Sequence, residues 1–399
     1  MKKTIMLNHL HLIGISLLLI FVSCSSDNTN ETANNESVEF QFEIIDSLIV
    51  DYLGTPLLSD FSPNQERILL YNSRNTEFIV TDKNGEILKQ FSKEGDIPDN
   101  PGTLADRPIF YDNETIIAHG QKGIWAYNFE GENVWKIERE EPISYWFSKS
   151  YGRSMYLLDP PHYFTVINYD LLALNASNDS LYENQHALKV VNRQAKSIQA
   201  VIPLESFSRY LDGKGYQPSS MLPSNHLNGN KMVISYSKDE IVYLYDWVNE
   251  SFQLADTFSL KIEPFYLDEG KERDSFEGQN GFMFGGKIGE AEVRGSWLMD
   301  DNRILVQYNR GVKESERQEA KTESVGENSI RLIMPDNVPA DQFQIYKDGE
   351  KFGTPFNKIK ALSSLLHIEG DTFWFKKNNE ALGVEDDYAV FYKTKLVQK

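Results

Sequence analysis

The sequence contains a single cysteine, Cys24, and no apolar run long enough to cross a membrane as a helix. One cysteine cannot form an internal disulfide, so the folded part of the chain must be stable through its core alone. The most apolar stretch, residues 12–22, falls short of the ~20 residues that a membrane-spanning helix needs. It suits the core of a signal peptide, because dense polar sequence follows at once and disfavours a buried N-terminal helix.

Positive charge is also scarce. The chain has 40 Lys and Arg residues against 59 Asp and Glu residues, which gives a formal net charge of −19 at pH 7. This excess of negative charge would repel the phosphates of nucleic acids and anionic lipid head groups. We therefore expect no nucleic-acid partner, and we interpret the charge as a source of solubility in an exposed compartment.

Motifs that identify a reaction are missing as well. The chain has no His-Glu-x-x-His and no Gly-x-Ser-x-Gly, and its glycine-rich residues 281–289 lack the Gly-Lys-Ser/Thr ending of a phosphate loop. The histidines that follow Cys24 show no metal-ligand spacing, which leaves open only a metal site assembled from distant segments: they are His119, His162, His186, His226 and His367. We predict no metal and no cofactor, and the sequence assigns no catalytic or ligand-binding residue.

The N-terminal residues carry the clearest targeting signal. Positively charged Lys2 and Lys3 precede the apolar stretch, and residues 19–24 (LIFVSC) resemble the lipobox of bacterial lipoproteins. Ser23 supplies the small residue before the cleavage point, whereas Phe21 departs from the usual Leu. The resemblance implies a signal peptide over residues 1–23, cleavage before Cys24, diacylglycerol on its sulfur and an acyl chain such as palmitate on its amino group. Two or more acyl chains give stable membrane anchoring.

Residues 25–37 (SSDNTNETANNES) contain no aromatic residue and no Leu, Ile or Val. Such a segment cannot bury enough surface to offset its chain entropy, so we expect residues 24–37 to form a lipidated, disordered tether. In lipoprotein sorting, Asp directly after the cysteine favours retention at the inner membrane. Ser25 holds that position here, so the resemblance implies anchoring to the outer membrane through Cys24, on its periplasmic face or at the cell surface.

A strand–turn–strand unit recurs in the rest of the chain. Residues 78–91 (FIVTDKNGEILKQF) and 124–137 (IWAYNFEGENVWKI) share a turn that ends in Gly-Glu. Gly85 and Gly131 take the turn position that needs positive φ, and Asn249 takes it in residues 241–252. A shorter copy surrounds residues 346–350 (YKDGE), and Tyr169-Asp170 can begin a degenerate copy with its hairpin near residue 175.

A second pattern, a polar turn followed at once by a β-branched or aromatic run, precedes each hairpin. It recurs six times, at residues 62–71, 111–119, 151–158, 228–236, 301–309 and 369–375. Short strands repeated in this way over residues 38–399 favour radial repetition, because an open sheet of that size would leave long unpaired edges. We predict an all-β fold, a single β-propeller of six four-stranded blades. Seven or eight blades are the alternative, since residues 192–228, 262–297 and 310–330 are long enough to hide strands, and a β-sandwich pair or an irregular all-β domain is the other.

The segment FSPNQERILLY (61–71) is similar to the FSPDG-type strand start of TolB-like propellers. Together with the lipobox and the irregular hairpins, it makes the chain resemble an uncharacterised, domain-of-unknown-function family of bacterial β-propeller lipoproteins. These shared motifs are structural and imply no catalytic residue.

The two ends of the folded part are predicted to meet. The last unit runs through the strands 371–375 and 388–392 and then leaves too little chain for an outer strand. Residues 40–50 (FQFEIIDSLIV) are apolar, rich in β-formers and otherwise without a place, so we predict that they pair with residues 388–396 and close the ring. The charged segment 310–329 is predicted to be a solvated excursion from a blade, partly mobile or helical, and open to early proteolysis.

The preferred function is a binding or scaffolding module with a protein or glycan partner in the cell envelope. The alternative is an envelope hydrolase that acts on glycan or peptide at the central channel. Convergent carboxylates at the channel mouth or a buried His–Asp pair would favour the hydrolase.

Overall fold

The turn signals of the sequence separate short antiparallel strands in the computed structural model, which describes residues 38–142, 153–159, 162–277, 287–319, 321–324, 330–333 and 335–399. These described residues belong to one unit, Val38–Lys399. Cys24 and the predicted signal peptide and tether lie outside them. The glycine-rich residues 281–289 lie outside them for the most part.

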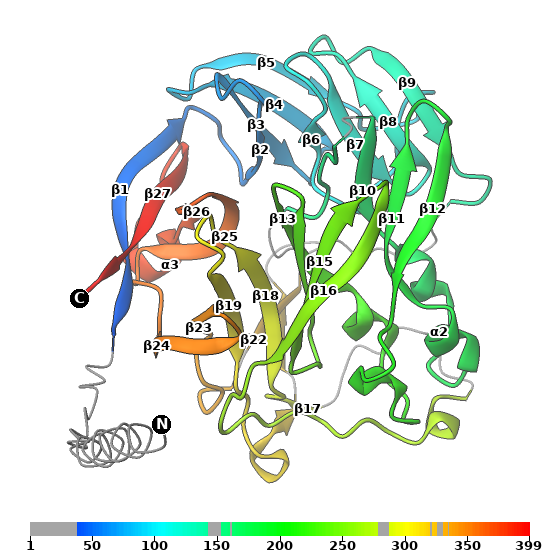
Figure 1. Ribbon diagram of the computed structural model, residues 1–399. Helices are drawn as coiled ribbons and strands as arrows, with labels where there is room; N and C mark the ends of the chain where they lie inside the picture. Colours follow the sequence, from blue (N-terminus) through cyan, green and yellow to red (C-terminus); the bar gives the residue numbers. More distant parts are fainter. Residues whose placement is uncertain are drawn as a thin grey trace, which may run out of the picture. The chain divides into compact units, whose positions relative to one another are not determined.

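The described strands form eight sheets, of which six are blades that follow one another in chain order (Figure 1). Blade 1 contains β2 (Leu57–Phe61), β3 (Arg67–Asn72), β4 (Glu77–Asp82) and β5 (Ile87–Ser92). Blade 2 contains β6 (Ile109–Phe110), β7 (Ile116–Gly120), β8 (Gly123–Tyr127) and β9 (Asn133–Glu138). Blade 3 contains β10 (Tyr163–Ile167), β11 (His186–Asn192) and β12 (Ser197–Pro203).

Blade 4 contains β13 (Pro223–Asn228), β14 (Lys231–Tyr236), β15 (Ile241–Val248) and β16 (Ser251–Ser259). Blade 5 contains β18 (Glu292–Leu298), β19 (Ile304–Asn309), β23 (Gln342–Lys347) and β24 (Glu350–Phe356). Blade 6 contains β25 (Leu362–Glu369), β26 (Thr372–Lys377), β27 (Ala389–Gln398) and β1 (Phe40–Val50).

The first strands of neighbouring blades contact one another, as β2 does with β6 and β25, and β13 with β18. The first strands therefore surround the axis, and the later strands of each blade lie progressively outward. This arrangement confirms the predicted six-bladed β-propeller. In the described residues, the stretches that were long enough to hide a further blade contribute β12 to blade 3, β13 to blade 4 and most of β18 to blade 5. Their other residues form connections, which carry only short two-stranded pairs.

Positive φ angles confirm four of the five predicted hairpins. Gly85 (φ 90°), Gly131 (φ 80°), Gly349 (φ 75°) and Asn249 (φ 50°) each stand between the third and fourth strands of a blade. Glycine reaches this region without a Cβ clash, and Asn is among the side chains that tolerate it best.

The fifth predicted hairpin, near residue 175 of blade 3, is wrong. Tyr169-Asp170 begins a 3₁₀ helix, η1 (Tyr169–Ala173), and the helix α2 (Asp179–Glu183) follows it. Asn168 and Asn178 cap these two helices by accepting hydrogen bonds from Asp170 N and Ser180 N, and such capping competes with strand formation. The hairpin of this blade lies instead between β11 and β12.

The innermost position of blade 3 also differs from the expected turn-and-strand at residues 151–158. Residues 153–158 run along β10, with a bridge between Leu157 and Phe164 and a hydrogen bond of 2.9 Å from Leu158 N to Tyr163 O. They hold the place of a first strand rather than a second strand. The segment therefore brings its side chains to the propeller axis.

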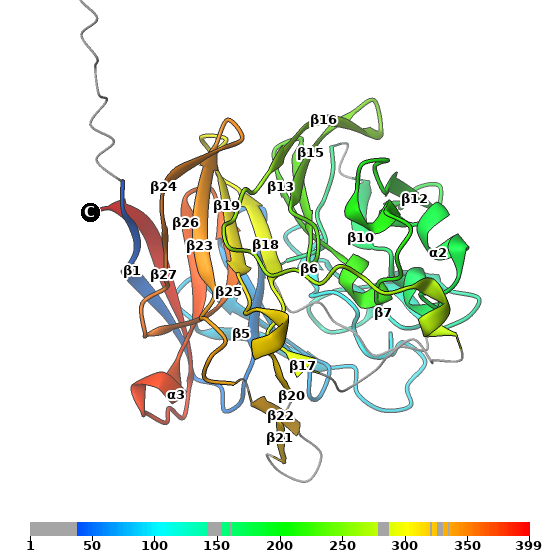
Figure 2. The ribbon, with the colours of Figure 1, turned by 90° about the horizontal axis from the view of Figure 1, so that it is seen from below.

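The N-terminal strand closes the ring as predicted. β1 pairs antiparallel with β27, from Phe40 opposite Gln398 to Val50 opposite Ala389. Figures 1 and 2 both show the two strands side by side. Blade 6 therefore takes three strands from the C-terminal end and its outermost strand from the N-terminal end.

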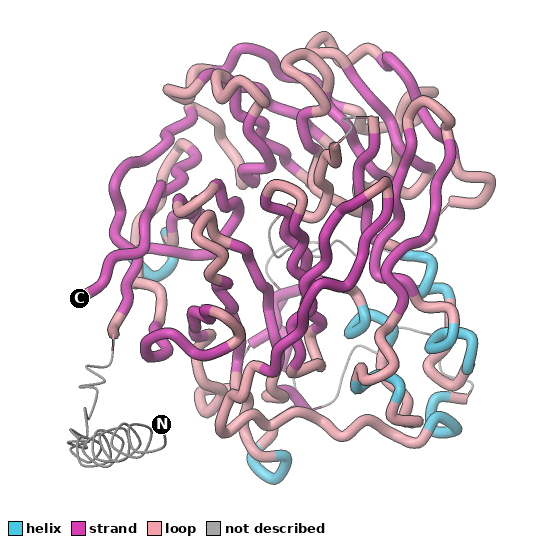
Figure 3. Tube along the Cα trace, viewed as in Figure 1, coloured by secondary structure: helices cyan, strands magenta, loops and turns pink. Residues whose placement is uncertain are grey.

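Within the residues that the structure describes, the helices are short and lie in the connections between strands (Figure 3). They include η2 (Arg209–Leu211), η3 (Pro218–Met221), η4 (Arg273–Phe276), η5 (Glu314–Glu316) and α3 (Asn379–Leu382). The predicted excursion over residues 310–329 departs from blade 5 between β19 and β23 and carries β20 (Gln318–Glu319), which pairs with β17 (Lys287–Ile288), and β21 (Lys321–Ser324), which pairs with β22 (Ile330–Ile333). No helix in the described part of the chain has both the length and the apolar character that crossing a membrane requires.

Candidate functional site

The last residues of several first strands converge on a pocket at one end of the propeller axis. The pocket has a volume of about 210 Å³, and we call it the axial pocket. It is lined by Asp60, Phe61, Gln65, Arg153, Tyr156, His226, Leu227, Asn228, Gly229, Trp297, Leu366, His367, Ile368, Glu369 and Gly370. Because the first strands all run in the same direction along the axis, their last residues, which are far apart in the sequence, meet at the mouth of the axial pocket.

An ion pair between a buried carboxylate and a partly exposed guanidinium joins blades 1 and 3 in the axial pocket. Arg153 Nη1 donates to Asp60 Oδ1 at 2.6 Å, and Phe110 N donates to Asp60 Oδ2 at 2.9 Å. Arg153 also lies over the ring of Tyr156, 5.0 Å from its centroid. Burial raises the pKa of Asp60, and the charge of Arg153 opposes that rise. Each charge of the pair thus has a partner of opposite sign.

The ring of His226 forms hydrogen bonds with backbone groups of neighbouring blades. Its Nδ1 accepts a hydrogen bond from Leu298 N at 3.2 Å, and its ring also hydrogen-bonds the backbone of Ile368. These contacts join β13 to β18 and β25. Burial lowers the pKa of His226 to about 4, with a further contribution from the charge of Arg153. The ring is therefore neutral near pH 7.

His367 has a similar burial but different contacts. Only 7% of the residue is exposed, and its ring packs against Phe61 with 5.0 Å between the ring centroids. Burial holds the pKa of His367 well below its ordinary value, helped by the charge of Arg153. Its Nδ1 is buried and has no hydrogen-bond partner among the described residues. A neutral imidazole with unused hydrogen-bonding capacity therefore lines the pocket.

The rim of the axial pocket carries the one acidic side chain that Arg153 does not pair. Glu369 is exposed, and its carboxylate accepts no hydrogen bond from a residue that the structure describes. Partial burial raises the pKa of Glu369, while the charge of Lys393 opposes the rise. Apolar and aromatic side chains, including Phe61, Trp297 and Leu366, complete the wall.

A buried His–Asp pair also exists, away from the axial pocket. His119 Nδ1 lies 2.6 Å from Asp106 Oδ2, with exposures of 3% and 2% for the two residues. Ser154 donates to the other oxygen of Asp106 rather than to His119. A nucleophilic triad needs the histidine between the hydroxyl and the carboxylate, so this order does not activate Ser154.

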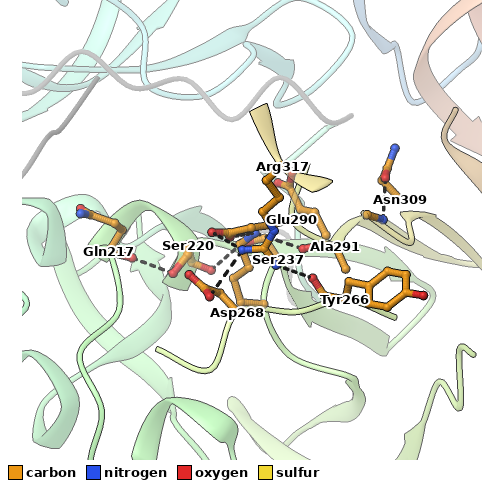
Figure 4. A network of polar contacts seen from close by, with 12 residues as sticks. Gln217, Ser220, Ser237, Tyr266, Asp268, Glu290, Ala291, Asn309 and Arg317 are labelled. Carbon is orange, nitrogen blue, oxygen red and sulfur yellow. Dashed lines mark hydrogen bonds and ion pairs between the residues drawn. The ribbon is translucent and has the colours of Figure 1, made fainter. Parts of the chain in front are cut away.

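A second polar network lies where the first strands of blades 4 and 5 begin, opposite the axial pocket (Figure 4). Arg317, whose side chain is 6% exposed, donates to Tyr266 O at 3.1 Å and lies 3.6 Å from Glu290 Oε1. Glu290 also pairs with Lys238 at 2.6 Å. These contacts tie the excursion from blade 5 to the connection that precedes β18. We interpret the network as structural.

No spacing or motif predicts that Asp60, Arg153, Glu369 and the two histidines meet. Asp60, His226, His367 and Glu369 all stand near the end of a first strand, shortly before its polar turn. Polar residues at those positions were the available signal, because the strand ends share one mouth. Within the described residues no group of three or more His, Cys, Asp or Glu side chains is arranged to hold a metal ion.

The remaining predicted residues lie apart from the axial pocket. His162 stacks on Tyr163, and His186 Nδ1 lies 2.8 Å from Asn184 O. Asp386 forms an ion pair with Lys377 at 2.7 Å. Cys24, the predicted site of lipid attachment, is outside the described residues.

Comparisons with known proteins place the chain in a family. Residues 35–282 match the family model described as domain of unknown function DUF4221. A crystal structure of a DUF4221 member from Bacteroides vulgatus is similar over 90% of this chain and 99% of that chain, at 14% identity and a TM-score of 0.56. A protein from Bacteroides fragilis that is proposed to be exported matches over 92% of this chain and 96% of its own, at 13% identity and a TM-score of 0.49. No curated protein sequence matches. Because the family model covers more than half of the chain, the protein belongs to the DUF4221 family.

Proposed function

We propose that this protein is a binding module of the cell envelope, anchored to the outer membrane by lipid on Cys24, and that the axial pocket holds its ligand. The single observation that carries the binding role is the convergence of polar groups with spare hydrogen-bonding capacity in one pocket, above all His367. Ligand sites are typically concave, mostly apolar and equipped with a few convergent polar groups. The axial pocket is concave and has such convergent polar groups, but its surface is more polar than apolar, and it belongs to a scaffold of strands.

The anchoring part of the proposal rests on the N-terminal sequence. Residues 1–23 have the organisation of a signal peptide, and Cys24 follows the apolar stretch directly. The polar residues 25–37 would then place the propeller at a distance from the membrane. Partners in this setting are envelope proteins, glycans or their small components, and the negative net charge argues against nucleic acids.

One observation favours the alternative, an envelope hydrolase: the buried pair of His119 and Asp106. The geometry opposes that function, because Ser154 binds the carboxylate and both members of the pair are almost fully buried. In the axial pocket, Asp60 is paired with Arg153. The other carboxylate near Glu369, Asp300, lies beside Gly370 at the rim and accepts a hydrogen bond from Asn228 Nδ2 at 3.0 Å, so each carboxylate beside Glu369 already has a partner. Binding without catalysis therefore accounts for more of the structure.

Native mass spectrometry tests the proposal. The protein is purified from its own membranes in mild detergent, and its mass is measured under native and denaturing conditions. We expect diacylglycerol and acyl chains on Cys24 in both spectra, and an additional small molecule in the native spectrum alone. An unlipidated, full-length precursor would contradict the anchor. A native mass without any bound molecule, unchanged after incubation with an envelope extract, would contradict the binding role.

A further inference from the structure

The two buried histidines of the axial pocket have nearly equal exposure, 6% for His226 and 7% for His367, yet opposite hydrogen-bonding states. His226 uses its ring to join blades, whereas His367 leaves Nδ1 without a partner in the described structure. A buried polar atom without a partner destabilises a protein. His367 lines the axial pocket, but its Nδ1 has almost no exposed surface, so a ligand satisfies this atom only if the ring turns as the pocket is filled.

A neutral imidazole offers one donor and one acceptor. Hydroxyl groups also donate and accept, so they complement such a ring in either tautomer. A carboxylate only accepts and an ammonium group only donates, so each uses half of this capacity. The chemistry of His367 therefore favours a hydroxyl-bearing ligand.

The charges that line the axial pocket favour a ligand without net charge. Asp60 and Arg153 neutralise each other, and the histidines are uncharged near pH 7. An anionic ligand would meet the carboxylates of Asp60 and Glu369, and a cationic ligand would meet the guanidinium of Arg153. Glu369, which forms no ion pair among the described residues, stands at the exposed rim, where water screens it and the charges of Lys393 and Arg153 partly offset it.

The size and the lining of the axial pocket restrict the class of ligand further. The volume of about 210 Å³ equals roughly seven water molecules at ~30 Å³ each, which accommodates a single sugar ring and excludes a longer saccharide from the interior. Phe61 and Trp297 supply flat apolar surfaces for the C–H faces of such a ring. The carboxylate of Glu369 is placed to accept from hydroxyl groups near the mouth.

From these contacts we infer that the axial pocket binds a neutral monosaccharide unit, free or at the end of a glycan, with His367 as its buried hydrogen-bonding partner. This inference rests on the proposed function, because it names the ligand class of the same pocket. His367 contributes to binding and not to folding, and His226 contributes to folding.

Two matched variants separate these roles. In His367→Phe the ring still packs on Phe61, but the unpaired nitrogen is gone, so we expect Tm to rise by about 2 °C and sugar binding to weaken roughly tenfold or more. In His226→Phe the hydrogen bonds to Leu298 and Ile368 are lost, so Tm should fall. Binding that is unchanged in His367→Phe would overturn the role of His367.

Isothermal titration of the purified protein tests the ligand class. The panel contains D-glucose, D-galactose, D-mannose and N-acetylglucosamine, with succinate and lysine as charged probes. We expect at least one sugar to bind, with little dependence on ionic strength. In Glu369→Gln, which still accepts hydrogen bonds, sugar affinity should change less than threefold, whereas an amine ligand would lose roughly tenfold.

The outcomes separate this inference from the proposed function. Binding of succinate or lysine alone overturns the sugar assignment and leaves the axial pocket as a ligand site. A lack of heat with every sugar also overturns the assignment, and the native mass spectrum then decides whether the pocket holds another ligand.

Discussion

The ring of Phe42 lies 4.8 Å from the ring of Phe375, centroid to centroid, although the two residues belong to opposite ends of the chain. Phe42 also contacts Phe343 of blade 5, with 5.1 Å between the centroids. A register shift between Ile44 and Asp46 then turns β1, so that its second half packs Leu48 and Val50 against blade 1. One N-terminal strand therefore packs against both blades that flank blade 6.

Phe42→Ala should destabilise the whole propeller by about 3–5 kcal/mol, because Phe42 is 1% exposed and its removal leaves a cavity among four phenylalanines. Urea denaturation measures the loss. Ile45→Ala is the control in the same strand: Ile45 is 45% exposed, so its free energy of unfolding should change by less than about 0.5 kcal/mol. Similar losses for both variants would show that β1 does not close the ring through Phe42.

Deletion of residues 38–50 extends this prediction from one side chain to the strand. Blade 6 would lose its outermost strand, and β27 would present a row of unpaired backbone groups. We expect a large fall in Tm for this deletion and no change for deletion of residues 25–37. Equal melting temperatures for the two truncations would contradict closure by β1.

The ion pair between Asp60 and Arg153 predicts that substitutions at these two residues have strongly non-additive effects on the free energy of unfolding. Arg153→Met should cost about 3–5 kcal/mol, because the carboxylate of Asp60, 1% exposed, is left without its cation. Asp60→Asn in that background should restore part of the stability. A double-mutant cycle by urea denaturation should give a coupling energy of about 2 kcal/mol, and additive single losses would count against the pair.

Stability should fall in mild acid because of His226. Its folded-state pKa of about 4 lies below the ordinary value of 6.5, so the unfolded chain binds the proton more readily. The stability that neutral His226 contributes is present above pH 6.5 and is lost as the pH falls toward 4, by about 3 kcal/mol in total. His226→Phe should flatten the dependence of the unfolding free energy on pH in this window. A slope equal to that of wild type would contradict the assignment.

Cys24→Ser tests the anchor independently of the propeller. The variant has no sulfur for the diacylglycerol, so we expect an uncleaved or mislocalised precursor in cell fractionation. Processing and outer-membrane fractionation equal to those of wild type would show that Cys24 is not the lipidated residue.

The hairpins of the propeller were predictable because Gly85 and Asn249 mark backbone positions that few other residues tolerate. The hairpin of blade 3 lacks such a residue: Lys196 takes the positive φ, and Asn192 stabilises the turn by accepting from Ala195 N at 2.9 Å. The sequence of this turn therefore does not mark a hairpin, and the Tyr169-Asp170 pattern placed the predicted hairpin at the wrong position. Closure by β1 was predictable from an apolar segment that had no other partner.

The axial pocket was not predictable from spacing, because His226 and His367 meet only through the radial arrangement of blades 4 and 6. Their positions near the ends of first strands became meaningful once the ring order was known. The hydrogen-bonding states that distinguish them depend on backbone atoms of other blades, such as Leu298 N, which no local pattern reveals.

The most direct test of the axial pocket as the ligand site is NMR of the histidine side chains in protein labelled with ¹⁵N-histidine. Addition of the ligand identified by mass spectrometry or calorimetry should shift the ring nitrogens of His367, whose Nδ1 gains its missing partner. The ring nitrogens of His119, held by Asp106 away from the pocket, should not move. A ligand that saturates the protein and leaves the His367 signals unchanged would contradict the account.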